Sequence, residues 1–251
     1  MSRNGLLLLG SWLLSGAALV YGPPPLAGVL TFVFVMLGWV VALAVHEFGH
    51  AFIAWKAGDH TVEAAGYLTF DPLKYADLAT SIVIPVIVLA IGGIALPGGA
   101  VYLRPDLMRS PLWRSAASLA GPTGTLLVLV VLAILLAVGA GSGWGGALWP
   151  ALALALLALF QAMAFFFNLL PVPGLDGYGV IRPFLSAGLQ QRLAPVERFA
   201  IFALIAAVFF LPGASEALFG VALSLTSLLG IDTQQIAQGY VNFHFWRSGG
   251  G

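Results

Sequence analysis

VALAVHEFGHAFIAW occupies positions 41–55 and places two histidines and a glutamate in a run of apolar residues. Such a run is typical of a helix in the hydrocarbon of a membrane, where ionisable groups are costly and are usually functional. His46 and His50 are one helical turn apart, so a helix places both imidazoles on one face, where they can converge on a metal ion. Glu47 is turned about 100° away, which places it beside a metal-bound water and not among the ligands.

The spacing His-Glu-x-x-His is the zinc-binding arrangement of many metalloproteases. In that arrangement the metal lowers the pKa of a bound water, and the glutamate accepts the proton. The alternative is a polar cluster that only joins neighbouring helices, which would desolvate three titratable groups for packing alone. The motif therefore predicts a catalytic zinc site, which needs a third protein ligand and one open position.

The composition is that of an integral membrane protein. Of the 251 residues, 60% are hydrophobic and only 8% are charged, against about 25% in ordinary soluble domains, and the mean hydropathy is +1.00. Ten basic and ten acidic residues give no net charge, which argues against nucleic acid as a partner. The chain has no cysteine, so any metal must be bound by His, Asp or Glu.

Apolar segments separated by Gly- and Pro-rich breaks predict an all-α polytopic membrane protein. They lie at 6–22, 26–55, 81–103, 115–138, 148–170, 199–212 and 214–230. If 81–103 crosses the membrane fully, the ten Lys and Arg are divided between its two sides, against the positive-inside bias. If 81–103 enters and returns as a re-entrant hairpin, all ten fall on one side. We therefore expect about six transmembrane helices plus one re-entrant hairpin, with both termini cytoplasmic.

The sequence predicts one membrane-embedded domain over 1–251, with a catalytic core at about 26–185 and C-terminal helices at 199–230. The first apolar segment could be a cleaved signal peptide, but its small-residue cleavage site is poor, which favours a retained helix. VEAAGYLTF at 62–70 is strand-like and predicts a short β element near 60–103, whose edge could pair with an unwound substrate strand.

Candidates for the third metal ligand fall into two groups. The first group lies in a polar loop or in the aromatic tail, where a polar side chain needs no special reason: Asp59, His60, Glu63, Asp71, Asp77 and His244. Asp176 differs, because FFFNLLPVPGLDGYG at 165–179 ends an apolar helix with two prolines and three glycines. This helix and the HEFGH helix both run from outside to inside, so we expect Asn168 and Asp176 at the depth of the histidines. The alternative for Asn168 and Asp176 is an ordinary helix end followed by a turn.

Two motifs together resemble the site-2 protease family of intramembrane zinc metalloproteases: HEFGH at 46–50 and NLLPVPGLDG at 168–177. GYLTFDPLKYAD at 66–77 and SLAGPTGTLL at 118–127 support the resemblance, which covers about 26–185. Related sequences commonly continue the AGP segment to an Asn where this chain reads AGPTGT, so the sequence leaves open what makes the polar contact of that Asn. The chain is expected to lack the regulatory PDZ or CBS domain of some relatives, so gating would come from short loops or a separate regulatory protein.

The resemblance implies one Zn²⁺ per chain, bound by His46, His50 and Asp176. It implies Glu47 as the general base and acid, and Asn168 as a residue that steadies the substrate backbone or the oxyanion. The implied reaction is hydrolysis of a peptide bond in or near the transmembrane segment of a membrane-anchored protein. The site would lie near the cytoplasmic side of a multi-pass cell-membrane protein.

Two alternatives for the function stay open. A membrane-bound metallopeptidase of leader peptides would share every catalytic residue, so the sequence does not separate it from an intramembrane protease. A non-catalytic transporter or scaffold could use polar groups beside a broken helix to bind an ion or a solute. The acidic residue after the first ligand histidine favours hydrolysis, because transport needs no base there.

Overall fold

The computed structural model describes residues 1–74, 86–89, 101–142 and 148–247. In these residues every regular element is helical, which confirms the all-α class for the described part of the chain. The longer helices are α1 (Arg3–Tyr21), α2 (Ala27–Ala57), α5 (Pro111–Ser142), α6 (Leu148–Leu169), α8 (Ala187–Phe210), α9 (Ala214–Leu228) and α10 (Thr233–Phe243). Short helical turns lie between or after them: η1 (Pro24–Leu26), α3 (Thr61–Ala64), η2 (Tyr67–Thr69), η4 (Pro105–Leu107), α7 (Asp176–Ile181), η6 (Arg182–Phe184) and η7 (Phe245–Arg247).

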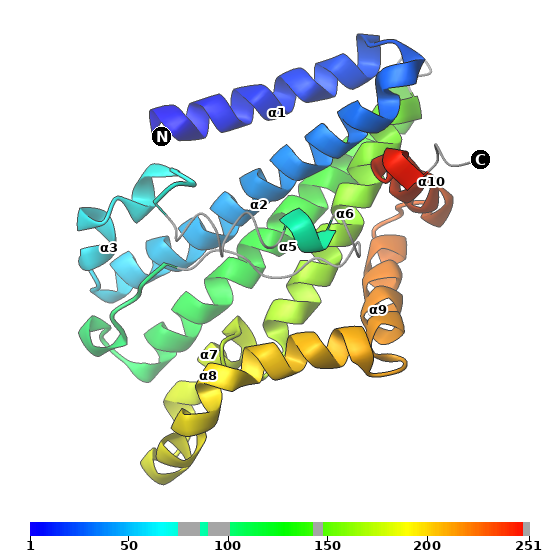
Figure 1. The fold of residues 1–251 in the computed structure, drawn as a ribbon. Coiled ribbons are helices and arrows are strands. Elements are labelled where there is room, and N and C mark those ends of the chain that lie inside the picture. The colour runs from blue at the N-terminus through cyan, green and yellow to red at the C-terminus, as the bar shows by residue number, and fades with distance from the viewer. Residues whose placement is uncertain (75–85, 90–100, 143–147, 248–251) are drawn as a thin grey trace.

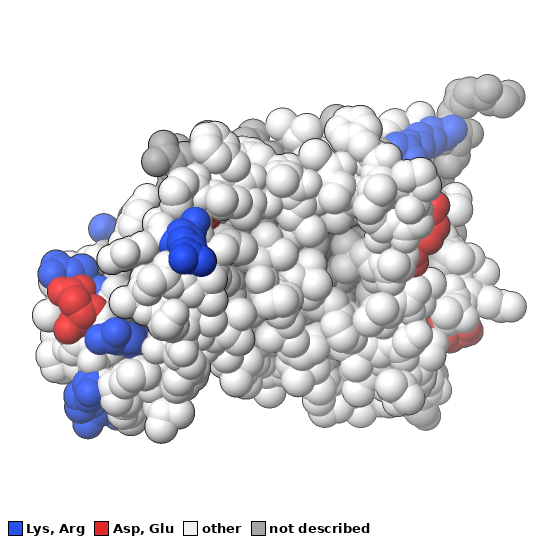
Figure 2. Space-filling view, turned by 90° about the horizontal axis from the view of Figure 1, so that it is seen from below, with Lys and Arg blue, Asp and Glu red and all other residues white. Residues whose placement is uncertain are grey.

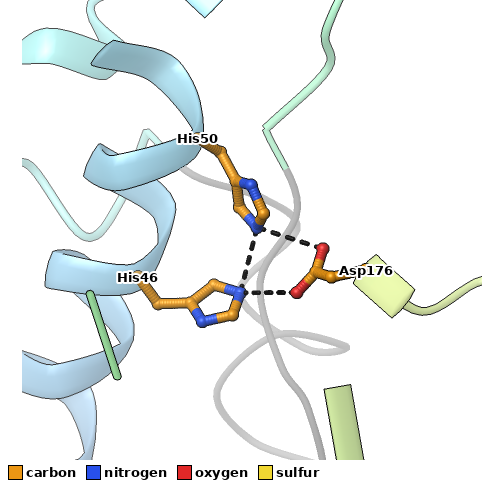
Figure 3. A group of neighbouring side chains, drawn as sticks. All are labelled: His46, His50 and Asp176. Atoms are coloured by element: carbon orange, nitrogen blue, oxygen red, sulfur yellow. Dashed lines mark hydrogen bonds and ion pairs between the residues drawn. The ribbon is translucent and has the colours of Figure 1, made fainter. Parts of the chain in front are cut away.

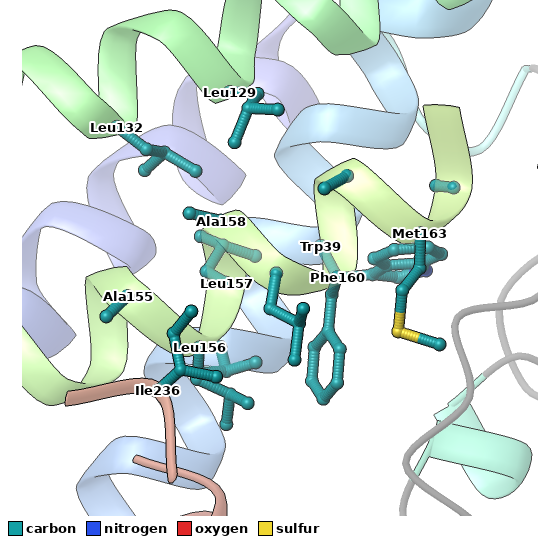
Figure 4. Packing of buried hydrophobic residues seen from close by; sticks show 14 of the residues in the cluster. Trp39, Leu129, Leu132, Ala155, Leu156, Leu157, Ala158, Phe160, Met163 and Ile236 are labelled. Carbon is teal, nitrogen blue, oxygen red and sulfur yellow. The ribbon is translucent and has the colours of Figure 1, made fainter. Parts of the chain in front are cut away.

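Helix α6 is the centre of the fold (Figure 1). Its sequence LWPALALALLALFQAMAFFFNL is apolar on nearly every side, and a helix of this kind is normally enclosed by others. In the most apolar stretch of 18 residues in α6, 83% of the residues are buried. The corresponding stretches of the spans that contain α2 and α5 are 44% and 22% buried. The helices α2, α5, α9 and α10 pack around it. Figure 4 shows Phe160 and Met163 of α6 in this core with Trp39 of α2 and Leu129 of α5.

Among the described residues, four helices are long and apolar enough to cross a membrane: Arg3–Tyr21, Pro24–Ala57, Pro111–Ala140 and Leu148–Leu169. The two parts of α8, Ala187–Glu197 and Phe199–Phe210, pass the same test as a pair bent by 60° and could form a fifth span. Pro195 lies just before the bend, where a proline removes a helical hydrogen bond. Helix α9, with 15 residues, is shorter than a span. The expected count of six is therefore not confirmed.

The strand expected in 62–70 is wrong. These residues form α3 and η2, joined by a turn at Gly66, which has φ of 79°. Phe70 also has a positive φ of 59°, so the chain cannot continue in the extended form that a strand requires. The re-entrant hairpin predicted at 81–103 lies mostly outside the described residues. Within this range only 86–89, which are helical, and 101–103 are described.

The two ends of the chain lie at opposite ends of α2, which differs from the expectation that both termini share one side. The backbone N–H of Ser2 donates to the carbonyl of Thr69, beyond the last turn of α2. At the other terminus Phe245 packs directly against Gly28 in the first turn of α2. The reason is α10, an amphipathic helix without a long apolar run, which packs against the beginnings of α2 and α6.

Basic residues gather at the end of the bundle where α2 ends. Figure 2 shows most of the visible Lys and Arg side chains at this end, with a broad uncharged surface beside them and one basic group near the C-terminal residues. The residues at this end are Lys56 in the last turn of α2, Arg104 and Arg109 in the loop before α5, and Arg114 in the first turn of α5. The distribution agrees with the positive-inside bias for the loops, but not for the C-terminus.

Small residues bring α2 and α5 into close contact. A Cβ at Gly49 would lie 2.6 Å from the carbonyl oxygen of Ala120, and one at Gly124 would lie 3.1 Å from the carbonyl oxygen of Val45. Glycines of this kind allow two membrane helices to approach backbone to backbone. The HEFGH segment of α2 is therefore held directly against the AGPTGT segment of α5.

Candidate metal centre

Three ligand atoms converge between α2 and α7 (Figure 3). The Nε2 atoms of His46 and His50 lie 3.0 Å apart. The two carboxylate oxygens of Asp176 lie 3.2 Å from them, Oδ2 from His46 and Oδ1 from His50. Both histidines are buried, and the Asp176 side chain is 18% exposed. The structure thus brings together the three residues proposed as ligands from the sequence.

Hydrogen bonds at the other ring nitrogens determine which imidazole nitrogens are free to bind a metal. His50 Nδ1 lies 2.7 Å from the carbonyl oxygen of Ala117, which can only accept, so Nδ1 carries the proton. His46 Nδ1 lies 2.9 Å from Thr125 Oγ1, whose hydroxyl in turn points to the carbonyl of Gly121 at 3.4 Å. Thr125 Oγ1 then accepts from His46. In the neutral rings both Nε2 atoms therefore carry lone pairs directed at the centre, as metal-binding histidines require.

The donor set fits a zinc ion. Two imidazole lone pairs and an acidic carboxylate would repel one another at these distances unless a cation lay between them. The Oδ2 atom of Asp176 is buried and makes no hydrogen bond with the described residues, although His46 is its neighbour. Two nitrogens and one carboxylate are also a usual ligand set of catalytic zinc, which keeps one further position open.

Gly121 of α5 lies directly against the ligand atoms. A Cβ at this position would clash with Nε2 of His50 and with Nε2 of His46. Only glycine leaves space beside these two atoms, so the AGP segment contributes room and not a side chain. The sequence did not single out Gly121, Thr125 or the carbonyl of Ala117. The structure gives Thr125 the polar contact to His46 in the segment where related sequences commonly have an Asn.

The break after α6 carries Asp176 to the histidines. Helix α6 ends at Leu169, two prolines follow, and Gly174 turns the chain with φ of 95°, a conformation that favours glycine. Asp176 is the first residue of α7. A Cβ at Gly177 would clash with the carbonyl oxygens of Leu169 and Leu170, so this glycine lets α7 fold back against the end of α6.

Two hydrogen bonds anchor α7. Ser115 of α5 donates to the carbonyl of Val180 at 2.6 Å, and the hydroxyl of Tyr178 donates to Glu197 of α8 at 2.6 Å. Burial and the bond to Glu197 raise the pKa of Tyr178 above its usual value, so the phenol stays protonated and continues to donate. The short helix that presents Asp176 is therefore fixed to both α5 and α8.

Glu47 lies beside the three ligand residues without bridging them. It is 3% exposed and within electrostatic range of His46, His50 and Asp176. The backbone N–H of Val101 donates to its Oε2 at 3.0 Å, which orients the carboxylate. Val101, in the loop before α5, thus contacts the carboxylate beside the centre.

Asn168 is buried in the last turn of α6 and lines a cavity together with His46. The same cavity is lined by Thr125 of α5 and Gln161 of α6. Asn168 therefore shares a cavity with the ligand residue His46. An uncharged amide is a weaker zinc ligand than an imidazole or a carboxylate, so this position suits contact with a substrate.

The acidic candidates for the third ligand in the polar loop have structural contacts instead. Asp59 is fully buried and accepts hydrogen bonds from the N–H of Thr61 at 3.1 Å and of Arg104 at 2.7 Å. Asp71 accepts from the side-chain amide of Asn4 at 3.0 and 3.1 Å. Both carboxylates join segments that are distant in sequence, and neither belongs to the metal-binding group.

The remaining candidates also lie outside this group. Glu63 accepts from Trp55 Nε1 at 3.1 Å, and the ring of His60 packs edge-on against Trp55. His244 is buried in the aromatic tail with Nδ1 2.9 Å from the carbonyl of Tyr240. Asp77 is outside the described residues.

Relatives of the chain are named as zinc metalloproteases. It is 41% identical to the "Putative zinc metalloprotease Rip2" of Mycobacterium tuberculosis (strain H37Rv) over 226 residues, which cover 88% of this chain and 84% of that protein. It is 39% identical to the protein of the same name in Mycolicibacterium smegmatis, with the same coverage. It is 27% identical to the "Putative zinc metalloprotease YwhC" of Bacillus subtilis over 178 residues, 66% of this chain and 75% of that protein. No family model and no solved structure matches the chain.

Proposed function

Because the chain belongs to the site-2 protease family of zinc metalloproteases, we propose that it hydrolyses a peptide bond in or near the transmembrane segment of membrane-anchored proteins. The observation that carries the proposal is Glu47, a buried carboxylate next to three converging ligand residues. A binding site for an ion or a solute has no use for a fourth, non-ligating acid at this place. Hydrolysis needs one as a base.

In this proposal His46, His50 and Asp176 hold one zinc ion. When bound, zinc supplies a Lewis acid that polarises the scissile carbonyl and lowers the pKa of water. Glu47 accepts the proton of the attacking water and passes it to the leaving nitrogen, so it acts first as base and then as acid. The N–H of Val101 holds one oxygen of Glu47, which leaves the other free for the proton.

The proposed substrate is a membrane-anchored protein because two of the three ligands come from a helix that suits a membrane. His46 and His50 lie on α2, inside a segment of 34 residues with the length and apolar character of a span. A substrate helix buries its carbonyls in its own hydrogen bonds, so it must unwind locally before the scissile bond reaches this site. Cleavage of a panel of single-span membrane proteins co-expressed with the chain tests the proposal. Products cut only in soluble leader peptides would favour the alternative metallopeptidase.

We further propose that the end of the bundle with the basic loops is cytoplasmic, which places the metal centre near that side of the membrane. Because the chain has no cysteine, single cysteines introduced at Arg109 and Arg247 would each be the only thiol in the protein. The backbone N–H of Arg109 donates to the carbonyl of Ala57 at the end of α2. Arg247 comes two residues after Phe245, which packs against the first turn of α2. We expect membrane-impermeant maleimide to label Arg247→Cys from outside the cell and Arg109→Cys only after permeabilisation. Labelling of Arg109→Cys in intact cells would contradict this topology.

Asn168 is proposed to contact the substrate and not the metal, since an amide is a poor zinc ligand but a good donor to a carbonyl oxygen. Asn168→Ala should reduce kcat/KM by about 100-fold if one contact to the developing oxyanion is lost. Zinc content should stay at the wild-type level. Metal analysis of the purified variant checks the second point, and loss of zinc would move Asn168 into the ligand set.

A further inference from the structure

A cavity of about 160 Å³ lies at the basic end of the bundle, where α5 begins and α7 ends. A buried water needs only about 10–15 Å³, so this space admits a group of several heavy atoms. Its walls include Met108 of the loop before α5, Arg114 and Ser118 of α5, Gly179 of α7 and Arg182 of η6. Arg182 is exposed and Met108 is buried, so the cavity opens at the surface and has a closed floor.

The cavity has two cations in its walls and no acidic side chain among the described residues that line it. Arg182 contacts Glu197, with its Nε 3.4 Å from a carboxylate oxygen. Asp106 lies within electrostatic range of Arg114, but its carboxylate accepts from Arg104 at 2.8 and 3.0 Å. Arg114 is thus left without an ion pair in the described part of the chain, and its Nε is buried there without a hydrogen bond. A buried donor of a cation without a partner is costly, which indicates an anionic ligand.

The depth of Arg114 favours a phosphate group as this anion. Arg114 lies in the first turn of α5, whose apolar span Pro111–Ala140 has 30 residues. Such a helix is about 45 Å long, which matches a bilayer with both of its headgroup layers and exceeds the hydrocarbon core of about 30 Å. A span centred in the bilayer therefore places Arg114 at the level of the lipid phosphates. A guanidinium binds phosphate through two parallel N–H groups.

Apolar side chains beside the cavity favour a phospholipid over a free phosphate ion. Leu107 precedes Met108 of the cavity wall, and Phe184 follows two residues after Arg182; both are exposed. Acyl chains would cover such side chains, whereas a free ion would leave them in water. The charge agrees as well, because one phosphodiester carries a single negative charge and Arg114 is the one described lining cation without an acid beside it.

The cavity lies one helical turn beyond the metal centre. Ser118 comes three residues before Gly121, which lies against the ligand histidines, and Gly179 comes three residues after Asp176. A Cβ at Gly179 would lie 2.5 Å from Oγ of Ser118, so α5 and α7 touch between the cavity and the ligands. This contact argues against a substrate chain that runs from the metal centre into the cavity.

We propose that Arg114, with Arg182 at the rim, binds the phosphate group of an anionic phospholipid. Arg114 belongs to α5, and Arg182 directly follows α7. A phosphate between them holds α7 against α5 and so stabilises the short helix that presents Asp176. The site is independent of the proposed function, because lipid binding needs no cleavage. In the topology proposed above, the lipid belongs to the cytoplasmic leaflet, which is rich in anionic lipids.

The test is the unfolding temperature of the zinc-loaded protein in mixed micelles of detergent and phosphatidylglycerol, with zwitterionic phosphatidylcholine as the comparison. A lipid that binds only the folded protein raises this temperature as its mole fraction increases. Salt at about 0.5 M shortens the Debye length to about 4 Å and screens the general attraction of basic residues to the micelle surface. We expect phosphatidylglycerol to stabilise the wild type until the site is filled, and phosphatidylcholine to have little effect.

Arg114→Gln removes the unpaired charge and should raise the half-saturating mole fraction of phosphatidylglycerol about tenfold, the effect of one lost charge-assisted hydrogen bond. Arg182→Gln is a second variant, at an exposed position that the fold tolerates. It should raise the mole fraction by only about threefold, as expected for an exposed charge. Arg192→Gln is the matched control, because it removes the same charge from an exposed position of α8 outside the cavity. It should leave half-saturation unchanged.

Inorganic phosphate distinguishes the two sources of a phosphate group. If inorganic phosphate stabilised the wild type as strongly as phosphatidylglycerol, and Arg114→Gln abolished the effect, the occupant would be a free ion and the lipid assignment would be overturned. Equal stabilisation by phosphatidylglycerol and phosphatidylcholine would overturn the site itself. So would an unchanged half-saturation in both Arg114→Gln and Arg182→Gln. A protein that binds phosphatidylglycerol as expected but cuts no substrate would contradict only the proposed function.

Discussion

Glu47→Gln is expected to reduce proteolysis by about 10²–10⁴-fold while the zinc content of the protein stays at the wild-type level. Glutamine has the size of glutamate, and its carbonyl oxygen can accept the hydrogen bond that Val101 donates to Glu47 at 3.0 Å. It cannot accept a proton from water at neutral pH. Glu47 is not among the three residues whose ligand atoms converge, so metal binding should not depend on its charge. Metal analysis and cleavage of a co-expressed membrane-anchored substrate measure the two effects side by side.

The variant should also bind substrate without cutting it, so the substrate accumulates in complex with the protein. Glu63→Gln is the matched control, because Glu63 is exposed, its carboxylate accepts a hydrogen bond from Trp55 at 3.1 Å, and it lies outside the metal-binding group. A non-catalytic transporter or scaffold predicts that Glu47→Gln leaves function largely intact, since the polar contact is preserved. Proteolysis at the wild-type rate in Glu47→Gln would therefore defeat the proposed mechanism.

The residues of the metal centre could be predicted from sequence because each carries a local signal. In HEFGH the helical period alone places His46 and His50 on one face, and the structure shows their Nε2 atoms 3.0 Å apart. Asp176 follows an apolar helix that is broken by prolines and glycines, and such a break inside a hydrophobic chain needs protein around it. Equal depth in the membrane then suggests that the two motifs meet.

The groups that orient these residues could not be predicted in the same way. The carbonyl of Ala117 and the N–H of Val101 are backbone groups, which nearly every residue has. No sequence pattern therefore identifies them. Thr125 is an ordinary residue of a membrane helix until α5 is seen to lie against α2.

Errors in the predicted fold have two physical causes. In 62–70 the β-branched and aromatic residues favour a strand, but positive φ angles at Gly66 and Phe70 turn the chain into short helices. At the C-terminus a search for apolar segments misses α10, which is amphipathic, and so it misses the contact that brings Phe245 to Gly28. The position of the C-terminus at the beginning of α2 depends on that contact and not on hydropathy.

Asp176→Ala should remove both zinc and proteolysis, in contrast to Glu47→Gln. The change takes away one of three converging ligands and leaves the Nε2 atoms of His46 and His50 as the only protein ligands in the group. Loss of an outer partner of a ligand already weakens metal binding by about 10–100-fold, so loss of a ligand itself should weaken it by at least about 100-fold. Proteolysis should fall below detection, because no metal remains to activate water.

Zinc-dependent thermal stability measures this loss independently of activity. A metal that binds only the folded protein raises the unfolding temperature, and the rise becomes smaller as affinity falls. We expect added zinc to raise the unfolding temperature of the metal-stripped wild type and of the Asp106→Ala control, whose carboxylate is exposed and paired with Arg104 at 2.8 Å. The same addition should have little effect on Asp176→Ala. If Asp176→Ala gained as much stability from zinc as the wild type, the third ligand would have to be sought elsewhere; if it lost proteolysis alone and kept zinc, Asp176 would act on the substrate, as Asn168 is proposed to do.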